Sequence, residues 1–244
     1  SSSPPDEISV GKPIVDSWNT ATKKIILIGV LAPHSISEEI INAWASDPSV
    51  IVMTEKTSNI KHPSFIDAID RLIAPLENGL EDLLQRLQPD LLVSLGGMVV
   101  SKRIKNFLRK FPPKQHWHIH PKKAYDTYYV LSDHIKTEPQ NFFDQLLSKA
   151  SNSNLSKYNN QVSSIYNSNR LKGLNYVKQI PFSDLKVFQT IFKSIPDQLQ
   201  LQLANSSTIR YAQLFDLPKT VSVFCNRGTS GIDGSSSTAV GAAF

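Results

Sequence analysis

Arg227 and three glycines lie close together in the segment from Asn226 to Gly234, near the end of the sequence. The β-branched and apolar run at residues 220–225 predicts a buried parallel strand just before it. Glycines let the backbone approach a ligand closely, and the free N–H groups at a following helix start favour an anion. Arg227 adds a forked cation suited to a carboxylate or a phosphate. From spacing alone, an ordinary strand-to-helix turn with a solvated Arg227 explains the segment equally well.

The amino acids of three segments resemble one known family. Residues 226–239 have the sequence Asn-Arg-Gly-Thr-Ser-Gly-Ile-Asp-Gly-Ser-Ser-Ser-Thr-Ala, residues 205–210 are Asn-Ser-Ser-Thr-Ile-Arg, and residues 94–103 end in Lys102-Arg103. In this order they resemble the 2-succinyl-5-enolpyruvyl-6-hydroxy-3-cyclohexene-1-carboxylate synthases, thiamine-diphosphate enzymes of menaquinone biosynthesis. The resemblance covers most of the chain, whereas we expect the chain to cover only part of the family.

The resemblance also implies site residues. They are Lys102, Arg103, Arg210 and Arg227 toward the substrates, and Ser206 and Ile232 toward the cofactor. Arg227 would hold a substrate carboxylate, and Ile232 would be the apolar wedge under the bent cofactor. From the residues alone, Lys102 and Arg103 are better explained as a solvated helix face and Ile232 as ordinary core. No catalytic residue and no metal ligand is expected in this chain.

The activity implied by the resemblance belongs to a three-domain enzyme. It decarboxylates 2-oxoglutarate and adds the resulting succinyl carbanion to isochorismate, with thiamine diphosphate and Mg²⁺ as cofactors. This chain would supply the middle domain and the incomplete start of the diphosphate-binding domain, so by itself we expect it to be inactive and to bind neither cofactor. The whole enzyme would be a homodimer or a dimer of dimers acting on small carboxylates. The rival hypothesis is a stand-alone Rossmann-like module that binds an anionic metabolite or nucleotide through residues 96–103.

Composition limits the alternatives. The 244 residues are 40% hydrophobic, which supports a packed core, and the net charge is +5. The positive residues are scattered and match no nucleic-acid motif, so we expect no nucleic-acid partner. No apolar run is long enough to span a membrane and the start does not resemble a signal peptide, so a cytoplasmic location is expected. The single cysteine, Cys225, predicts a buried thiol, and the alternating His116, His118 and His120 lack the carboxylate that would favour a metal site.

Strands and helices alternate along the chain, which predicts an α/β fold: a Rossmann-like parallel sheet with helices on both faces. We divide the chain into a linker (1–22), a middle domain (23–150), an interdomain connection (151–180) and the start of a second α/β domain (181–244). The predicted strands are 24–30, 50–54, 90–95, 116–119, 128–131, 199–204 and 220–225. The predicted helices are 35–44, one beginning at residue 61, 80–87, 102–110, 142–150, one through Tyr166 and Leu171, 184–195 and 208–215.

Overall fold

The computed structural model describes residues 10–151 and 155–244. The strands are β1 (Lys24–Ile28), β2 (Val50–Met53), β3 (Leu91–Leu95), β4 (Gln115–Ile119), β5 (Asp133–Ile135), β6 (Gln200–Leu203) and β7 (Ser222–Cys225). The α-helices are α1 (Lys12–Thr20), α2 (Glu38–Ser46), α3 (Ile69–Ile73), α4 (Glu81–Arg86), α5 (Lys102–Lys110), α6 (Pro139–Lys149), α7 (Tyr158–Gln179), α8 (Asp184–Ser194), α9 (Ser207–Ala212) and α10 (Ser235–Ala242). The 3-10 turns are η1 (Lys56–Ser58) and η2 (Ala74–Leu76).

The main sheet is parallel throughout, and within the described residues its strand order is β2-β1-β3-β4-β5. Every residue of β1, β2 and β3 is buried. A strand covered on both faces needs apolar residues at successive positions, which explains the continuous hydrophobic runs in the sequence. The predicted α/β class with a parallel sheet is therefore confirmed.

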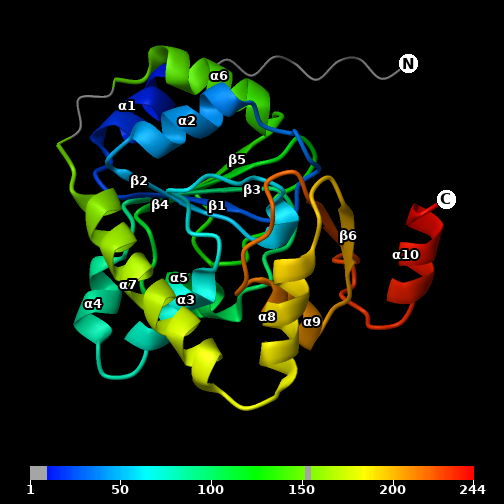
Figure 1. Ribbon diagram of the computed structural model, residues 1–244. Coiled ribbons are helices and arrows are strands. Elements are labelled where there is room, and N and C mark those ends of the chain that lie inside the picture. The colour runs from blue at the N-terminus through cyan, green and yellow to red at the C-terminus, as the bar shows by residue number, and fades with distance from the viewer. Residues whose placement is uncertain (1–9, 152–154) are drawn as a thin grey trace.

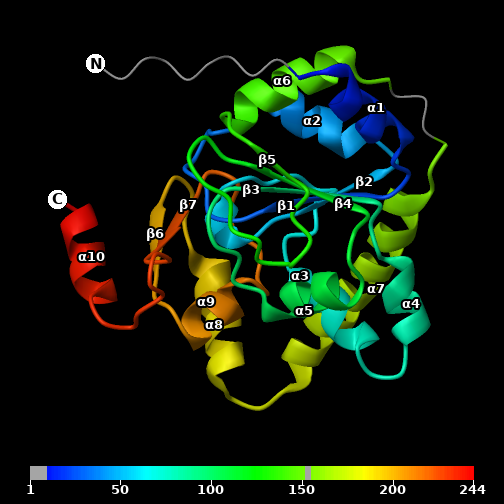
Figure 2. The same cartoon turned by 180° about the vertical axis from the view of Figure 1, so that it is seen from behind.

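Helices cover both faces of this sheet (Figures 1 and 2). Helices α1, α2 and α6 lie on one face, while α3, α5 and α7 lie on the other. The first face is closed by large aromatic side chains, among them Trp44 and Phe143, whose rings meet edge to face at 4.6 Å. The second face is filled by aliphatic residues and by three residues of α7: Tyr158, Val162 and Tyr166.

A smaller parallel pair, β6 and β7, stands beside the main sheet together with α8 and α9. Its core contains Leu203, Ile209 and Val223, and it also takes in Val100 from the loop after β3. Asn59, just after η1, exchanges hydrogen bonds with the backbone of Val223, donating to its carbonyl at 3.0 Å and accepting from its N–H at 2.7 Å. The small sheet is thus anchored to the carboxyl edge of the main sheet.

The structure corrects the prediction for residues 10–22. Residues 12–20 form helix α1 instead of a linker, with Pro13 in its first turn and Trp18 almost fully buried. Residues 1–9, the other part of the expected linker, lie outside the described residues. The Ser/Asn-rich connection expected at 151–180 is mostly helix α7, which packs on the middle domain.

Three element boundaries were also wrong. The segment 128–131 is a turn, because the Asp126 carboxylate accepts the N–H groups of Val130 and Leu131 at 2.9 and 3.0 Å, and the strand β5 begins only at residue 133. The helix expected from residue 61 begins at Ile69, since Ile66 first pairs with Met53 as a parallel bridge. The helix expected from residue 35 begins after Ser37, the actual cap.

Candidate functional site

Arg227 follows β7 directly, and its position is fixed by Asn205, the residue two places after β6. Because β6 and β7 are parallel neighbours, their carboxyl ends meet at one edge. The Asn205 side chain donates to the carbonyls of Asn226 at 2.8 Å and Gly231 at 2.7 Å, and its oxygen accepts from Arg227 Nη1 at 2.7 Å. Cys225 Sγ also donates to that oxygen at 3.3 Å. Asn205 is 4% exposed, so this amide fixes the glycine-containing loop and the arginine together.

Ser206 and Arg210 lie beside this loop on α9. Ser206 precedes the helix with φ 63° and ψ −128°, a backbone conformation that costs a non-glycine residue about 1–3 kcal/mol. Such strain persists only where surrounding contacts hold the chain, and here Asn205 supplies them. Arg210 is exposed and lines a mostly apolar cavity of about 400 Å³ between α3, α7 and α9. Ile232 is 70% exposed, so the interpretation of this residue as ordinary core does not hold within the chain.

Glu55 forms the other side of the site. It follows β2 and is 4% exposed, and its carboxylate accepts the N–H of Val100 at 2.7 Å and the N–H of Ser101 at 2.8 Å. These groups belong to the start of α5, where Ser101 Oγ also accepts from the Ile104 N–H at 3.1 Å. Burial raises the pKa of the Glu55 carboxyl group to about 7, although the two N–H donors and the nearby charge of Arg227 act in the opposite direction.

This arrangement weakens the rival hypothesis of a nucleotide-binding module. In such modules the N–H groups at a helix start after a parallel strand hold a phosphate, but here the Glu55 carboxylate accepts two of them. The space between the loops after β1 and β3 is also closed, because Gly97 N–H donates to the Val30 carbonyl at 2.8 Å. A Cβ added at Gly29 would lie 1.9 Å from the Gly97 carbonyl oxygen, so the two loops are in backbone contact.

The adjacent cations Lys102 and Arg103 are exposed at the start of α5. Arg103 forms an ion pair with Glu77, the residue after η2. Within the described chain, nothing brings either side chain into contact with Arg210 or Arg227. Lys105, one residue further along than the predicted pair needs, is half-buried and electrostatically coupled to both Glu55 and Arg227.

The histidines of β4 form a hydrogen-bonded group with Ser94 of β3. Ser94 Oγ lies 2.7 Å from His116 Nε2 and 2.8 Å from His118 Nδ1. Burial lowers the pKa of both imidazoles to about 4, so they are neutral at pH 7. In the part of the chain that the structure describes, no group of three or more His, Cys, Asp or Glu residues is placed to hold a metal ion.

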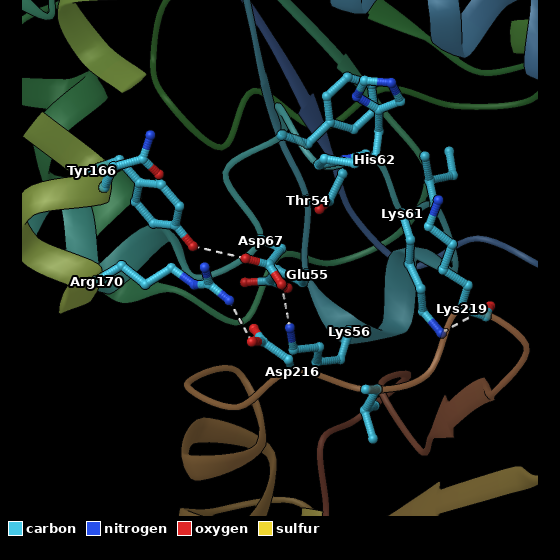
Figure 3. A pocket seen from close by; sticks show the side chains of 15 residues that line it. Thr54, Glu55, Lys56, Lys61, His62, Asp67, Tyr166, Arg170, Asp216 and Lys219 are labelled. Atoms are coloured by element: carbon cyan, nitrogen blue, oxygen red, sulfur yellow. Dashed lines mark hydrogen bonds and ion pairs between the residues drawn. The ribbon is translucent and has the colours of Figure 1, made fainter. Parts of the chain in front are cut away.

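A polar cavity of about 290 Å³ lies between η1, α7 and the segment before β7 (Figure 3). Its charges are paired with one another: Lys56 donates to Asp67 at 2.5 Å, and Tyr166 donates to the same carboxylate at 2.7 Å. Arg170 pairs with Asp216 across the cavity. On its other side, Lys61 donates to the carbonyls of Pro218 at 2.7 Å and Val221 at 2.6 Å, and burial lowers the pKa of Lys61 to about 8. This cavity therefore connects the two sheets instead of presenting free charges to a ligand.

Sequence reasoning identified Arg227 but missed three residues around it: Glu55, Lys105 and Asn205. Asn205 was present in the quoted segment without a role, and its four contacts depend on residues 20 to 26 positions later. A charged residue directly after a buried strand was the available sign for Glu55, because carboxyl ends of parallel strands gather at one edge.

Fold and site together define a class. A parallel sheet covered on both faces, followed by an arginine-bearing segment at a carboxyl edge, agrees with the family described as "Middle domain of thiamine pyrophosphate", which matches residues 5–203. The chain belongs to this family.

Named relatives carry the comparison further. The chain is 49% identical over 231 residues to a 2-succinyl-5-enolpyruvyl-6-hydroxy-3-cyclohexene-1-carboxylate synthase of Flavobacterium johnsoniae, covering 94% of the chain and 41% of that protein. The protein of the same name in Flavobacterium psychrophilum is 48% identical over the same shares of both chains. That of Porphyromonas gingivalis is 32% identical over 238 residues, 93% of the chain and 40% of the relative. The chain thus spans about two fifths of the length of these relatives.

No helix in the described residues combines the length and the apolar character needed to cross a membrane.

Proposed function

We propose that this chain is part of a thiamine-diphosphate-dependent synthase that joins 2-oxoglutarate, after decarboxylation, to isochorismate. The observation that carries the proposal is the 49% identity with a synthase of that name, which extends through the Arg227 segment since the match covers 94% of the chain. The whole enzyme would use Mg²⁺ with the cofactor and act as a cytoplasmic homo-oligomer, a dimer or a tetramer, in menaquinone biosynthesis.

The residues of this chain fit part of that task. Ile232 offers an exposed apolar side chain beside a glycine-containing loop, which suits contact with the apolar rings of thiamine diphosphate. Ser206 would lie beside the cofactor from the start of α9. When bound, thiamine diphosphate supplies the nucleophilic carbon and the electron sink that decarboxylation of a 2-oxo acid needs.

Both substrates carry more than one carboxylate, so the protein must bind and neutralise negative charge. Arg227 is suited to this role because its guanidinium stays charged and offers paired donors to a carboxylate. Asn205 holds the guanidinium from one side through Nη1 and leaves its other donors for a substrate. Arg210, four residues after Ser206, would act on a second carboxylate, while Lys102 and Arg103 would approach isochorismate once the whole enzyme is assembled.

The full-length protein tests the proposal. Incubated with thiamine diphosphate, Mg²⁺, 2-oxoglutarate and isochorismate, it is expected to release carbon dioxide and form the adduct, detected by mass spectrometry. Omission of any one component must abolish the adduct. The 244-residue chain alone serves as the matched control and is expected to be inactive. An intact protein that forms no adduct under these conditions contradicts the proposal.

A further inference from the structure

Two cations at the candidate site have unused hydrogen-bond donors. Arg227 Nε is shielded from solvent and has no hydrogen-bond partner among the described residues, although Nη1 is bonded to Asn205. A buried donor left without an acceptor costs about 1–3 kcal/mol, so an acceptor oxygen supplied by a ligand would relieve that cost. Arg227 is therefore held in place but incompletely satisfied.

The second cation is Lys105 on α5. It lies one helical turn after Ser101, and its side chain is half-buried. No hydrogen bond or ion pair between described residues engages its ammonium group, whereas Lys110 on the same helix pairs with Glu81 and Arg103 pairs with Glu77. Burial lowers the pKa of Lys105, and the charge of Arg227 adds to that effect while Glu55 opposes it. A half-buried ammonium without a partner is unusual, because burial penalises an unpaired charge.

Glu55 explains why the two cations lie near each other without being paired. Its carboxylate influences the titration of Lys105 and is itself influenced by Arg227. Its oxygens, however, accept from the backbone N–H groups of Val100 and Ser101, and no bond to either cation is formed. The cluster thus contains two cations against one carboxyl group whose oxygens are already used.

We propose that Lys105 and Arg227 together bind one carboxylate of the substrate, with the lysine contributed by the middle domain and the arginine by the segment after β7. The proposal deepens the synthase function and rests on it. It assigns Lys105, instead of the more conspicuous Lys102 and Arg103, as the middle-domain cation facing Arg227. The ligand class is a small polycarboxylate: Arg227 binds through its planar fork, and Lys105 adds a point charge from the opposite side.

The contact also has a consequence for domain arrangement. Lys105 belongs to α5, whose start is fixed to Glu55, and Glu55 directly precedes η1, which packs on β7. A carboxylate between Lys105 and Arg227 would therefore join the two sheets through a single ligand. Substrate binding is expected to stabilise this junction.

The test uses the full-length enzyme and the variant Lys105→Met, which keeps the aliphatic stem and removes the charge. Loss of one charge-assisted contact is expected to raise the KM of one carboxylate substrate about 10-fold or more, with a smaller change in kcat. Lys105→Arg retains a cation and is expected to restore most of the affinity. Lys110→Met, on the same helix but paired with Glu81 at the surface, is the matched control and should keep the wild-type KM.

Calorimetric titration of the same proteins with 2-oxoglutarate and with isochorismate separates the possible failures. An active wild-type enzyme whose Lys105→Met variant binds and converts both substrates like wild type overturns the two-cation subsite alone. A wild-type protein that binds neither carboxylate and forms no adduct overturns both this subsite and the synthase function. Equal KM increases in the Lys105→Met and Lys110→Met variants would also overturn the subsite, because the effect would then be one of general surface charge.

Discussion

Replacing Glu55 by glutamine removes the buried carboxyl group that caps α5, and the effect on stability is expected to depend on pH. Burial raises the folded-state pKa of this carboxyl group to about 7 from an ordinary value of 4.5. Between these values the folded chain keeps the Glu55 proton while the unfolded chain has lost it. The unfolded state therefore binds fewer protons, and the contribution of Glu55 to stability falls as pH rises through this window.

The magnitude follows from the size of the shift. It corresponds to about 3 kcal/mol of wild-type stability lost between pH 4.5 and pH 7. Glutamine does not titrate, so the free energy of unfolding of Glu55→Gln relative to wild type is expected to rise by about that amount over the window. The amide also places a donor near the Val100 N–H, which costs stability, but that cost is the same at every pH.

Urea denaturation followed by far-ultraviolet circular dichroism at pH 5 and pH 8 measures this difference. His116 and His118 titrate in the same range, since burial lowers the pKa of each to about 4, but both are present in the two proteins and cancel in the comparison. A free-energy difference that does not change with pH would refute the reasoning. A change of opposite sign would show that the N–H donors and Arg227 outweigh burial.

Two further changes test the loops around the site. Gly29→Ala places a Cβ 1.9 Å from the Gly97 carbonyl and is expected to destabilise the chain by about 3 kcal/mol or more, whereas Gly11→Ala, whose nearest contact is 3.6 Å, serves as the control in the same denaturation series. Asn205→Ala in the full-length enzyme is expected to lower kcat/KM about 10-fold or more and to add little in an Arg227→Lys background, because it acts through that arginine. Fully additive losses in this double-mutant cycle would instead assign Asn205 a separate structural role.

Much of the main sheet could be predicted from the sequence because its strands are buried on both faces. Residues 24–28 and 91–95 are apolar at nearly every position, a pattern that only a covered parallel strand requires. The same logic failed at residues 128–131, where aromatic and β-branched residues favour a strand. The Asp126 carboxylate there accepts two backbone N–H groups and stabilises a turn, an interaction that composition does not reveal.

The site was predictable only in part. Arg227 stands next to a strand end, so its place at a carboxyl edge follows from local sequence. Glu55 could not be placed, because its role depends on N–H groups 45 and 46 residues away. Lys105 sits beside Ile104 at the edge of the apolar face of α5, and periodicity does not decide whether such a lysine points to solvent or to a neighbouring segment.

The most direct test of the central claim is steady-state kinetics of Arg227→Lys in the full-length enzyme, with 2-oxoglutarate and isochorismate varied in turn. Lysine keeps the positive charge but loses the fork, so kcat/KM is expected to fall by about 10- to 100-fold, as for the loss of one charge-assisted hydrogen bond of about 1.5–3 kcal/mol. The melting temperature is expected to change little, because Arg227 lies outside the apolar cores. Wild-type kinetics in the lysine variant, or a large fall in melting temperature with a proportionate loss of activity, would contradict the account.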